Sequence, residues 1–285
     1  MNAPDTIQTS ESLGDILVAK GWLQAHDVQR IVERQASQGE RFGEAAIALK
    51  LLTQTDLDRA LSVQFNYGYL SDTDSHIGRE VVTAFKPFSK QAEEMRALRG
   101  QLMMRWFNGD PMRRVLSVVS QRPRDGRSFM LANLAVVFSQ QGQRTLIIDA
   151  DLRKPRQGAL FNTAAGPGLA GVLAGRSSLE AIHPVKGLPQ LHVLPAGAQP
   201  PNPQELVGMP SFGRLLERVS TAYDVVLVDT PAADTCSDAE LVASRTGAAL
   251  LLLRKNRSPL RPLNELARRL QDTGVASVGS ALNHY

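Results

Sequence analysis

The stretch that decides the fold of this chain runs from Val115 to Phe161. It opens with the apolar run Val115-Leu-Ser-Val-Val-Ser120 and continues through Gln121-Arg-Pro-Arg-Asp-Gly-Arg-Ser128. An amphipathic segment follows from Phe129 to Gln141, and Gly142 closes it. A short apolar run favours a strand, and an amphipathic segment of this length favours a helix. The stretch therefore predicts a strand, a phosphate-type loop and a helix, in that order.

The loop resembles the consensus P-loop, in which backbone amides surround phosphates, a Lys reaches the β and γ oxygens and a hydroxyl binds Mg²⁺. Gly126 and Ser128 hold the Gly and hydroxyl positions, whereas Arg127 stands where the Lys belongs and Arg124 replaces a loop glycine. We expect the nucleotide cofactor to bind along Arg124, Asp125, Gly126, Arg127, Ser128 and Phe129.

Carboxylates follow two further buried-type runs. Asp149 and Asp151 end the run that begins at Thr145, and Asp229 ends Val225-Val-Leu-Val228. Because ligand groups collect beyond the carboxyl ends of parallel strands, these residues should share one crevice with Ser128. Oxygen ligands suit Mg²⁺, so Ser128, Asp149 and Asp229 are the candidate metal ligands. The alternative is that each Asp only caps the helix that follows it.

Strands alternate with helical runs along the second part of the chain, which predicts parallel βαβ units. We expect an α/β fold, a P-loop NTPase-like, mostly parallel sheet with helices on both faces, preceded by a small α-helical domain. The candidate strands are 115–120, 145–149, 190–194, 224–229, 248–253 and 276–282.

The N-terminal part contains a repeat. Residues 12–35 and 41–64 follow one pattern of apolar and glycine positions at an offset of 29. A fixed period indicates a duplicated unit, here two short helices per copy, and two copies can bury each other's apolar faces. We expect a helical tandem-repeat domain at 1–85 and a P-loop domain at 86–285, with the boundary near residue 85.

Composition indicates a cytoplasmic protein. The polar N-terminus lacks the apolar core of a secretory signal, and the apolar patch from Ala248 to Leu253 is too short to span a membrane. The single Cys236 allows no internal disulfide. A formal charge of +4 permits an acidic partner or a membrane surface without requiring either, and we expect no nucleic-acid partner.

The loop, Asp149-Ala-Asp-Leu-Arg-Lys-Pro155 and Asp229-Thr-Pro231 together resemble the bacterial tyrosine kinases of polysaccharide export. Glu93-Glu-Met-Arg96-Ala-Leu-Arg99 is similar to that family's Glu-x-x-Arg-x-x-Arg helix, which is associated there with ring-like self-association. Pro200-Pro-Asn-Pro-Gln-Glu-Leu206 matches a further family segment. The likeness is strongest to the EpsG-type chain-length-determinant tyrosine kinases of exopolysaccharide loci.

This resemblance implies an ATP-dependent, Mg²⁺-dependent protein-tyrosine kinase that regulates exopolysaccharide chain length and export. It implies Asp149 as candidate base, Asp151 as an aid to metal or substrate, and Arg127 as the cation on the β and γ oxygens. It also implies a homo-oligomer at the periphery of the inner membrane, held by a chain-length-determinant membrane protein with an activating cytosolic tail. The family's C-terminal tyrosine cluster is missing, and Tyr285 is the one terminal candidate acceptor.

The repeat resembles the N-terminal domain of type II secretion and pilus-assembly ATPases, some of which bind cyclic di-GMP. The second copy keeps Arg41 and Gly43 of that motif, whereas Ser12 replaces the corresponding Arg of the first. Losing one charge-assisted contact costs about 1.5–3 kcal/mol. Cyclic di-GMP binding and protein docking therefore both stay open.

Two alternatives to an active kinase also stay open. One is a P-loop switch of the partition and cell-division-positioning type, in which Arg122 occupies the place of an extra signature Lys. The other is a catalytically weak, nucleotide-binding regulator, because Arg and Lys are not interchangeable at a phosphate site.

Overall fold

The computed structural model describes residues 12–64, 70, 76–163 and 166–284. It divides into two compact units, Met1–Tyr69 and Leu70–Tyr285, each of which is described by itself. Tyr67, Tyr69 and Tyr285 lie outside the described residues.

The first unit is built from helices that recur at the offset of the sequence repeat. They are α1 (Leu13–Ala19), α2 (Ala25–Gln38), α3 (Phe42–Ala48) and α4 (Gln54–Gln64). The caps recur as well. The Asp15 carboxylate accepts the backbone N–H of Ser12 at 3.1 Å, and the Glu44 carboxylate accepts that of Arg41 at 2.9 Å. An acidic side chain that satisfies an unpaired donor at a helix start stabilises that start.

The two copies bury their apolar faces together. Leu17, Leu23 and Ile31 of the first copy are buried with their counterparts in the second. Helix α1 packs on α4, and α2 packs on α3, so each copy covers the other. Gly43 is required for the close approach of α4, because a Cβ there would lie 2.5 Å from the Leu57 side chain. The second residue of each copy's first helix is thus fixed by packing.

The second unit is a seven-stranded sheet in the order β3-β4-β2-β5-β1-β6-β7. All neighbouring pairs are parallel except β3 and β4. The strands are β1 (Val115–Ser120), β2 (Thr145–Asp149), β3 (His183–Val185), β4 (Leu188–Leu194), β5 (Val225–Asp229), β6 (Ala248–Arg254) and β7 (Ala276–Asn283). This arrangement confirms the predicted α/β fold.

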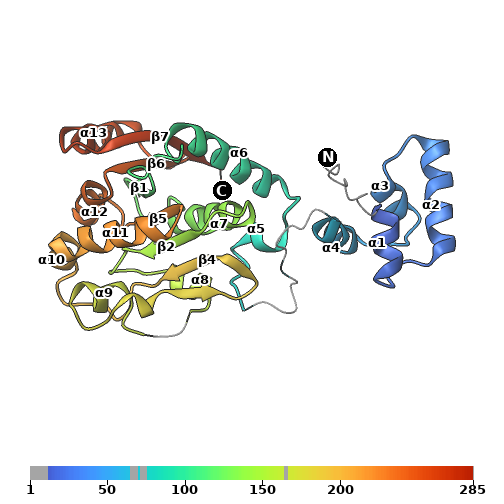
Figure 1. The fold of residues 1–285 in the computed structure, drawn as a ribbon. Helices are drawn as coiled ribbons and strands as arrows, with labels where there is room; N and C mark the ends of the chain where they lie inside the picture. The colour runs from blue at the N-terminus through green and yellow to red at the C-terminus, as the bar shows by residue number, and fades with distance from the viewer. Residues whose placement is uncertain (1–11, 65–69, 71–75, 164–165, 285) are drawn as a thin grey trace, which may run out of the picture. The chain divides into compact units, whose positions relative to one another are not determined.

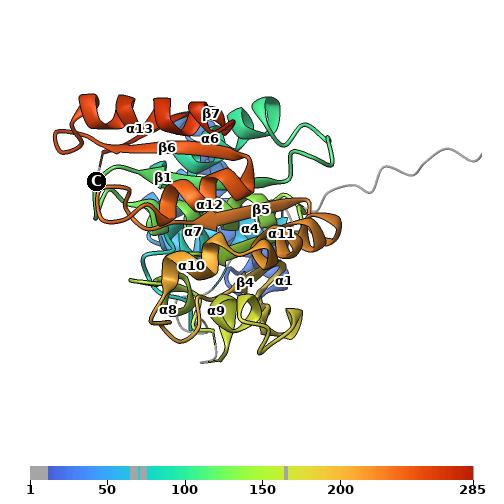
Figure 2. The ribbon, with the colours of Figure 1, turned by 90° about the vertical axis from the view of Figure 1, so that its left-hand side faces the viewer.

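Helices cover both faces of this sheet (Figure 1). Figure 2 shows α10, α11 and α12 in front of the strands. Ile147 of β2 faces the core formed with α7, whereas Leu146 and Ile148 face the core formed with α11, as the alternation along a strand requires. The helical segments are α5 (Val82–Phe85), α6 (Lys90–Arg105), α7 (Arg127–Gln140), α8 (Gln157–Leu160), α9 (Gly168–Leu173), η1 (Leu179–Ala181), α10 (Pro203–Gly208), α11 (Pro210–Ala222), α12 (Asp238–Thr246) and α13 (Leu260–Asp272).

The division between the units falls earlier than the predicted boundary near residue 85. Val81 and Phe85 are buried in the core that α7 forms with the sheet. The backbone N–H of Thr83 donates to Asn133 Oδ1 of α7 at 2.9 Å. Apolar burial and this buried hydrogen bond place α5 in the second unit.

Within the described residues, no helix combines the length and apolar character that crossing a bilayer requires.

Candidate nucleotide site

Three adjacent strands bring the predicted residues to one edge of the sheet. Strand β5 lies between β2 and β1, and Asp149 and Asp229 are direct partners in the β2–β5 register. Helix α7 begins at Arg127, immediately after the loop that follows β1. The carboxyl ends of β1, β5 and β2 therefore bring the loop and both carboxylates to one edge of the sheet.

The loop is braced through Asp125. This carboxylate is fully buried and accepts the backbone N–H of Arg122 at 3.1 Å and the Ser258 hydroxyl at 3.0 Å. The Asn283 side-chain amide donates to the Asp125 carbonyl at 2.9 Å. Residues from the ends of β6 and β7 thus hold the loop in shape.

Gly126 and Arg124 both have positive φ values, 101° and 65°. A Cβ at Gly126 would lie 2.3 Å from Asn283 Nδ2, so a glycine is required at this position on two grounds. Arg124 adopts the left-handed conformation in the place of a loop glycine, and the Arg254 guanidinium donates to its carbonyl at 3.0 Å. Backbone amides of the loop and the start of α7 form a typical anion-binding arrangement.

Arg127 is buried and points into the protein. Its Nε donates to the Thr230 carbonyl at 2.8 Å, and its Nη1 donates to the Arg122 carbonyl at 3.0 Å and to the Ser120 hydroxyl. The guanidinium that stands in the place of the P-loop Lys is therefore engaged by the ends of β1 and β5.

Asp229 is fully buried. The Gln157 side-chain amide donates to its Oδ2 at 2.8 Å. Burial raises the pKa of Asp229, although the neighbouring Ser128 hydroxyl and the Gln157 amide act to lower it. Its Oδ1 is buried and has no hydrogen-bond partner.

Asp149 is equally buried, and its Oδ2 accepts the backbone N–H groups of Arg156 and Gln157 at 2.9 and 2.8 Å. Burial, and then the charge of Asp229, raise the pKa of Asp149 well above its ordinary value of 3.8. One oxygen thus caps the start of α8, as expected if this Asp serves as a cap for the helix that follows it. The other oxygen, Oδ1, is buried without a partner and stays available to a ligand.

Asp151 has a different environment. Its Oδ1 accepts the backbone N–H groups of Arg153 and Lys154 at 3.2 and 2.9 Å, which shapes the turn after β2. The Arg153 fork in turn binds Asp238, with Nε to Oδ2 at 2.8 Å and Nη2 to Oδ1 at 3.2 Å. Asp238 is 2% exposed, so this bidentate pair fixes the turn to α12.

Sequence reasoning missed Gln157, Asp238, Ser258 and Asn283. Gln157 is fully buried and contacts both carboxylates, yet Gln belongs to no phosphate or metal motif. Asn283 and Ser258 reach the loop from more than 130 positions away. No local pattern marks such contacts, because they exist only once the sheet has formed.

The donor set fits a hydrated magnesium ion shared with a nucleotide. Asp149 Oδ1 and Asp229 Oδ1 are hard oxygen atoms, buried and without partners. Among the described residues, no three His, Cys, Asp or Glu side chains are grouped to hold a metal alone. That pattern agrees with Mg²⁺, which usually keeps water and takes phosphate oxygens as further ligands.

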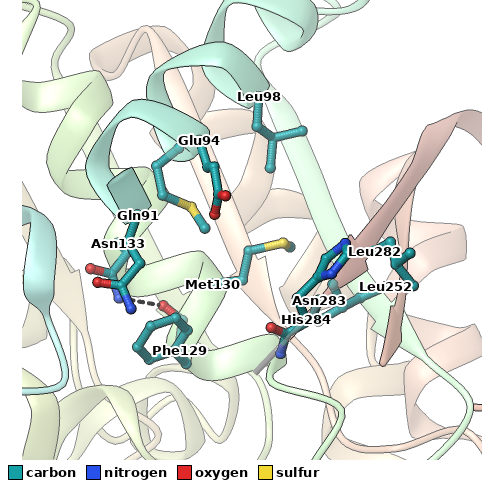
Figure 3. Close-up of a pocket in the computed structure, with 11 residues that line it drawn as sticks. Gln91, Glu94, Leu98, Phe129, Met130, Asn133, Leu252, Leu282, Asn283 and His284 are labelled. Carbon is teal, nitrogen blue, oxygen red and sulfur yellow. Dashed lines mark hydrogen bonds between the residues drawn. The ribbon is translucent and has the colours of Figure 1, made fainter. Parts of the chain in front are cut away.

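A cavity of about 310 Å³ adjoins the loop. Figure 3 shows side chains of α6, among them Gln91 and Leu98, on one side and Phe129 and Met130 of α7 on another, with Asn283 beside them. Phe129 directly follows Ser128, and Asn283, whose side-chain amide donates to the Asp125 carbonyl, also lines the cavity. Its lining residues are Gln91, Glu94, Met95, Leu98, Phe129, Met130, Asn133, Leu252, Leu282, Asn283 and His284.

The charged residues of the Glu-x-x-Arg-x-x-Arg motif form a charge stripe on α6, and its two arginines make different contacts. Arg96 pairs with Glu93 of its own helix, with Nη2 to Oε2 at 2.8 Å. Arg99 Nη1 instead donates to the Val137 carbonyl at 2.8 Å and ties α6 to α7. Glu93 is 72% exposed and Arg96 20%, so this pair forms the outward part of the stripe.

The remaining predicted positions have local roles. Pro203 is the first residue of α10, and Leu206 is buried, so the segment 200–206 starts that helix. Arg122 Nη1 donates to the Arg257 carbonyl at 3.3 Å. Arg41 is exposed at the start of α3.

Relatives of known name match most of the chain. The tyrosine-protein kinase YwqD of Bacillus subtilis is 33% identical over 209 residues, which cover 73% of this chain and 87% of YwqD. The chain belongs to the bacterial tyrosine kinase family. EpsB of Ralstonia solanacearum, a candidate tyrosine-protein kinase by its name, is 33% identical over 81% of this chain. The match spans 29% of the length of EpsB. No protein-family model matches the chain.

Solved structures of the family agree. The kinase domain of Escherichia coli tyrosine kinase ETK aligns with a TM-score of 0.67 and 32% identity over 71% of this chain and 79% of that domain. The septum site-determining protein MinD of Pyrococcus horikoshii, solved with Mg-ADP, aligns with a TM-score of 0.54 and 26% identity over 60% of this chain and 70% of MinD. The tyrosine kinase family fold is thus related to that of cell-division ATPases.

Proposed function

We propose that this chain is an ATP- and Mg²⁺-dependent protein-tyrosine kinase that regulates exopolysaccharide chain length and export. The observation that carries the proposal is the pair of register partners Asp149 and Asp229, each buried with one unpartnered oxygen beside a phosphate-type loop. Membership of the bacterial tyrosine kinase family supports the same activity.

The phosphates would bind the backbone amides of 124–128 and the start of α7, where the helix dipole favours negative charge. Ser128, Asp229 and Asp149 would hold the metal side. A bound Mg²⁺ supplies neutralisation of the phosphate charge that develops during transfer.

Asp149 would accept the proton of the acceptor hydroxyl. The tyrosine oxygen forms a bond to the γ-phosphorus, the bond from that phosphorus to the β–γ bridging oxygen breaks, and ADP leaves with phosphotyrosine as product. A base is most effective when its pKa lies near the working pH, and burial and Asp229 move the pKa of Asp149 in that direction. Asp151 would keep the turn after β2 in place for the substrate.

A weak or switch-like member is the second candidate, and one observation favours it. Arg127 is bound by protein oxygens of Ser120, Arg122 and Thr230. To neutralise the β and γ oxygens it would have to exchange these contacts for phosphate. If it does not, the loop would bind nucleotide and turn it over slowly, as a nucleotide-dependent regulator would.

The partner in this proposal is a chain-length-determinant membrane protein whose cytosolic tail activates the kinase and holds it at the inner membrane. The support is the family resemblance. Self-association through α6 belongs to the same proposal, and the Glu93–Arg96 pair, of which Glu93 is exposed, supports it. The acceptor is Tyr285 or a tyrosine of another protein.

The N-terminal unit would recruit or regulate, with cyclic di-GMP as a candidate ligand. Arg41 is exposed at the start of α3, where a positive helix end also favours phosphate. Its counterpart Ser12 bonds to Asp15 and supplies no charge. Docking of a protein is the alternative for this unit.

Transfer of labelled phosphate from ATP to tyrosine tests the proposed activity. Purified protein should label tyrosine in the presence of Mg²⁺, and the cytosolic tail of the membrane partner should increase the labelling. Asp149→Asn is the matched inactive variant. Nucleotide binding without any tyrosine labelling, with or without the tail, would favour the regulator.

A further inference from the structure

One glutamine side chain joins three segments of the site. Gln157 is fully buried at the start of α8. Its Nε2 donates to Asp229 Oδ2 at 2.8 Å and to the Ser128 carbonyl at 3.1 Å. The amide therefore connects the end of β5, the first turn of α7 and the segment that follows β2.

The backbone of the same residue holds the second carboxylate. The N–H of Gln157 donates to Asp149 Oδ2 at 2.8 Å. Both carboxylates thus have their Oδ2 atoms bound by Gln157, and both have their Oδ1 atoms buried without a partner. The Gln157 Oε1 atom is buried and unpartnered as well.

Three buried acceptors at Gln157 and the two carboxylates have no hydrogen-bond partner. Each costs folding free energy, because it has given up its bond to water. They are all oxygens, two of them carboxylates, so the ligand that satisfies them is a cation with its water. Gln157 binds Oδ2 of each carboxylate and leaves Oδ1 of each to that ligand.

We propose that Gln157 is the positioning residue for the metal side of this site: it orients Asp229 through its amide and Asp149 through its backbone, without touching the nucleotide. This inference rests on the proposed nucleotide and Mg²⁺ binding. It predicts that loss of the amide donor weakens the contribution of Mg²⁺ to nucleotide affinity and leaves metal-free nucleotide affinity intact.

Two variants separate the contribution of the Gln157 side-chain amide from that of its backbone N–H. Gln157→Met keeps the length and the N–H bond to Asp149 and removes the donor to Asp229. Gln157→Glu keeps the shape and sets an oxygen against Asp229 Oδ2. The control is Gln140→Met, a half-buried glutamine of α7 that donates to the Thr83 carbonyl at 3.2 Å. It lies 12 residues from Ser128, roughly 18 Å along the helix.

ADP binding to the full chain is measured by calorimetry with and without Mg²⁺, and Mn²⁺ binding to the ADP complex by electron paramagnetic resonance. We expect both Gln157 variants to lose about 10-fold or more of the Mg²⁺-dependent gain in ADP affinity. Mn²⁺ affinity should fall in parallel, and metal-free ADP affinity should stay within about 2-fold of the parent, because the amide acts on the metal ligands. Gln140→Met should match the parent in all three.

If Mg²⁺ increases the ADP affinity of Gln157→Met as much as that of the parent, this inference alone is overturned. A fall in metal-free ADP affinity equal to the fall with Mg²⁺ also overturns it, because that result describes a general loss of structure. A parent chain that binds no ADP under either condition overturns the proposed function, and this inference with it.

Discussion

Asp149 and Asp229 are register partners at the ends of neighbouring parallel strands, and both are completely buried. Each has one oxygen bound by Gln157 and one oxygen without a partner. Burial raises the pKa of both carboxyls, and the charge of Asp229 raises that of Asp149 further. Two buried like charges destabilise the fold unless a cation joins them, so stability and metal binding are coupled at this pair.

Asp149→Asn should stabilise the metal-free protein. A carboxyl with a raised folded-state pKa favours folding when protonated, and this stabilisation is lost as the pH rises above 3.8 toward the raised value. Asn keeps an oxygen for the Arg156 and Gln157 amides and cannot ionise. We expect a gain of about 1 kcal/mol at pH 8, roughly 2–4 °C in Tm, that shrinks as the pH falls toward 4.

Thermal unfolding without Mg²⁺ at pH 8 and pH 5 measures this effect. A variant that melts below the parent at pH 8 would show that the ionised pair does not strain the fold. Lys90→Ala, which removes one exposed ion pair of α6, is the control for a change of charge alone.

Arg127→Ala should weaken ATP binding or turnover strongly and should also lower stability. It leaves the Ser120 hydroxyl and the Thr230 carbonyl without their buried donor, a loss of about 1–3 kcal/mol. Arg127→Lys should retain or raise activity, because Lys is the residue that the consensus P-loop has at this position. ATP turnover and thermal unfolding are measured together. An Ala variant that binds and turns over ATP like the parent would make Arg127 a bystander.

Much of the sheet is predictable from local sequence. The buried apolar runs at 115–120, 145–149 and 225–229 are short and rich in Val and Ile, which favours parallel strands buried on both faces over a buried helix. Strand β3 was not predicted, since it has three residues, one of them Pro184, and pairs antiparallel at the sheet edge. The position of α5 was also missed, because its membership depends on the contact of Thr83 with Asn133 rather than on its own sequence.

The candidate site also combines features that the sequence predicts with features that it does not. Ser128, Asp149 and Asp229 were predictable, because residues at the ends of parallel strands converge whatever the loops do. The inward direction of Arg127 and the double contact of Gln157 were not, because they depend on side-chain geometry between segments far apart in the chain.

Self-association should depend on the outward pair of α6. Arg99 holds the Val137 carbonyl, so its loss would loosen α6 itself, and Arg96→Ala is the cleaner test. Since one exposed ion pair contributes little, the effect requires repetition around a ring. Light scattering with nucleotide should show smaller particles for Arg96→Ala than for the parent, with Lys90→Ala as control. A parent that is monomeric at micromolar concentration would refute the ring for this chain.

The first unit should bind cyclic di-GMP through Arg41. Removing a charge-assisted contact costs about 1.5–3 kcal/mol, so Arg41→Ala should weaken binding more than about 10-fold. Titration of the full chain measures it, and Arg30→Ala, an exposed arginine of α2, is the matched control. Absence of binding at ~100 μM, already a weak −5.5 kcal/mol, would leave protein docking as the role of this unit.

The central claim, that three strand ends form one metal–nucleotide site, is tested most directly by calorimetry of Asp229→Ala with ADP and Mg²⁺. Ala removes the carboxylate that Ser128 and Gln157 contact and leaves the loop at 121–126 intact. We predict that the folded variant loses the Mg²⁺-dependent part of ADP binding, whereas the parent shows it. Equal Mg²⁺-dependent affinity in the variant and the parent would contradict the account.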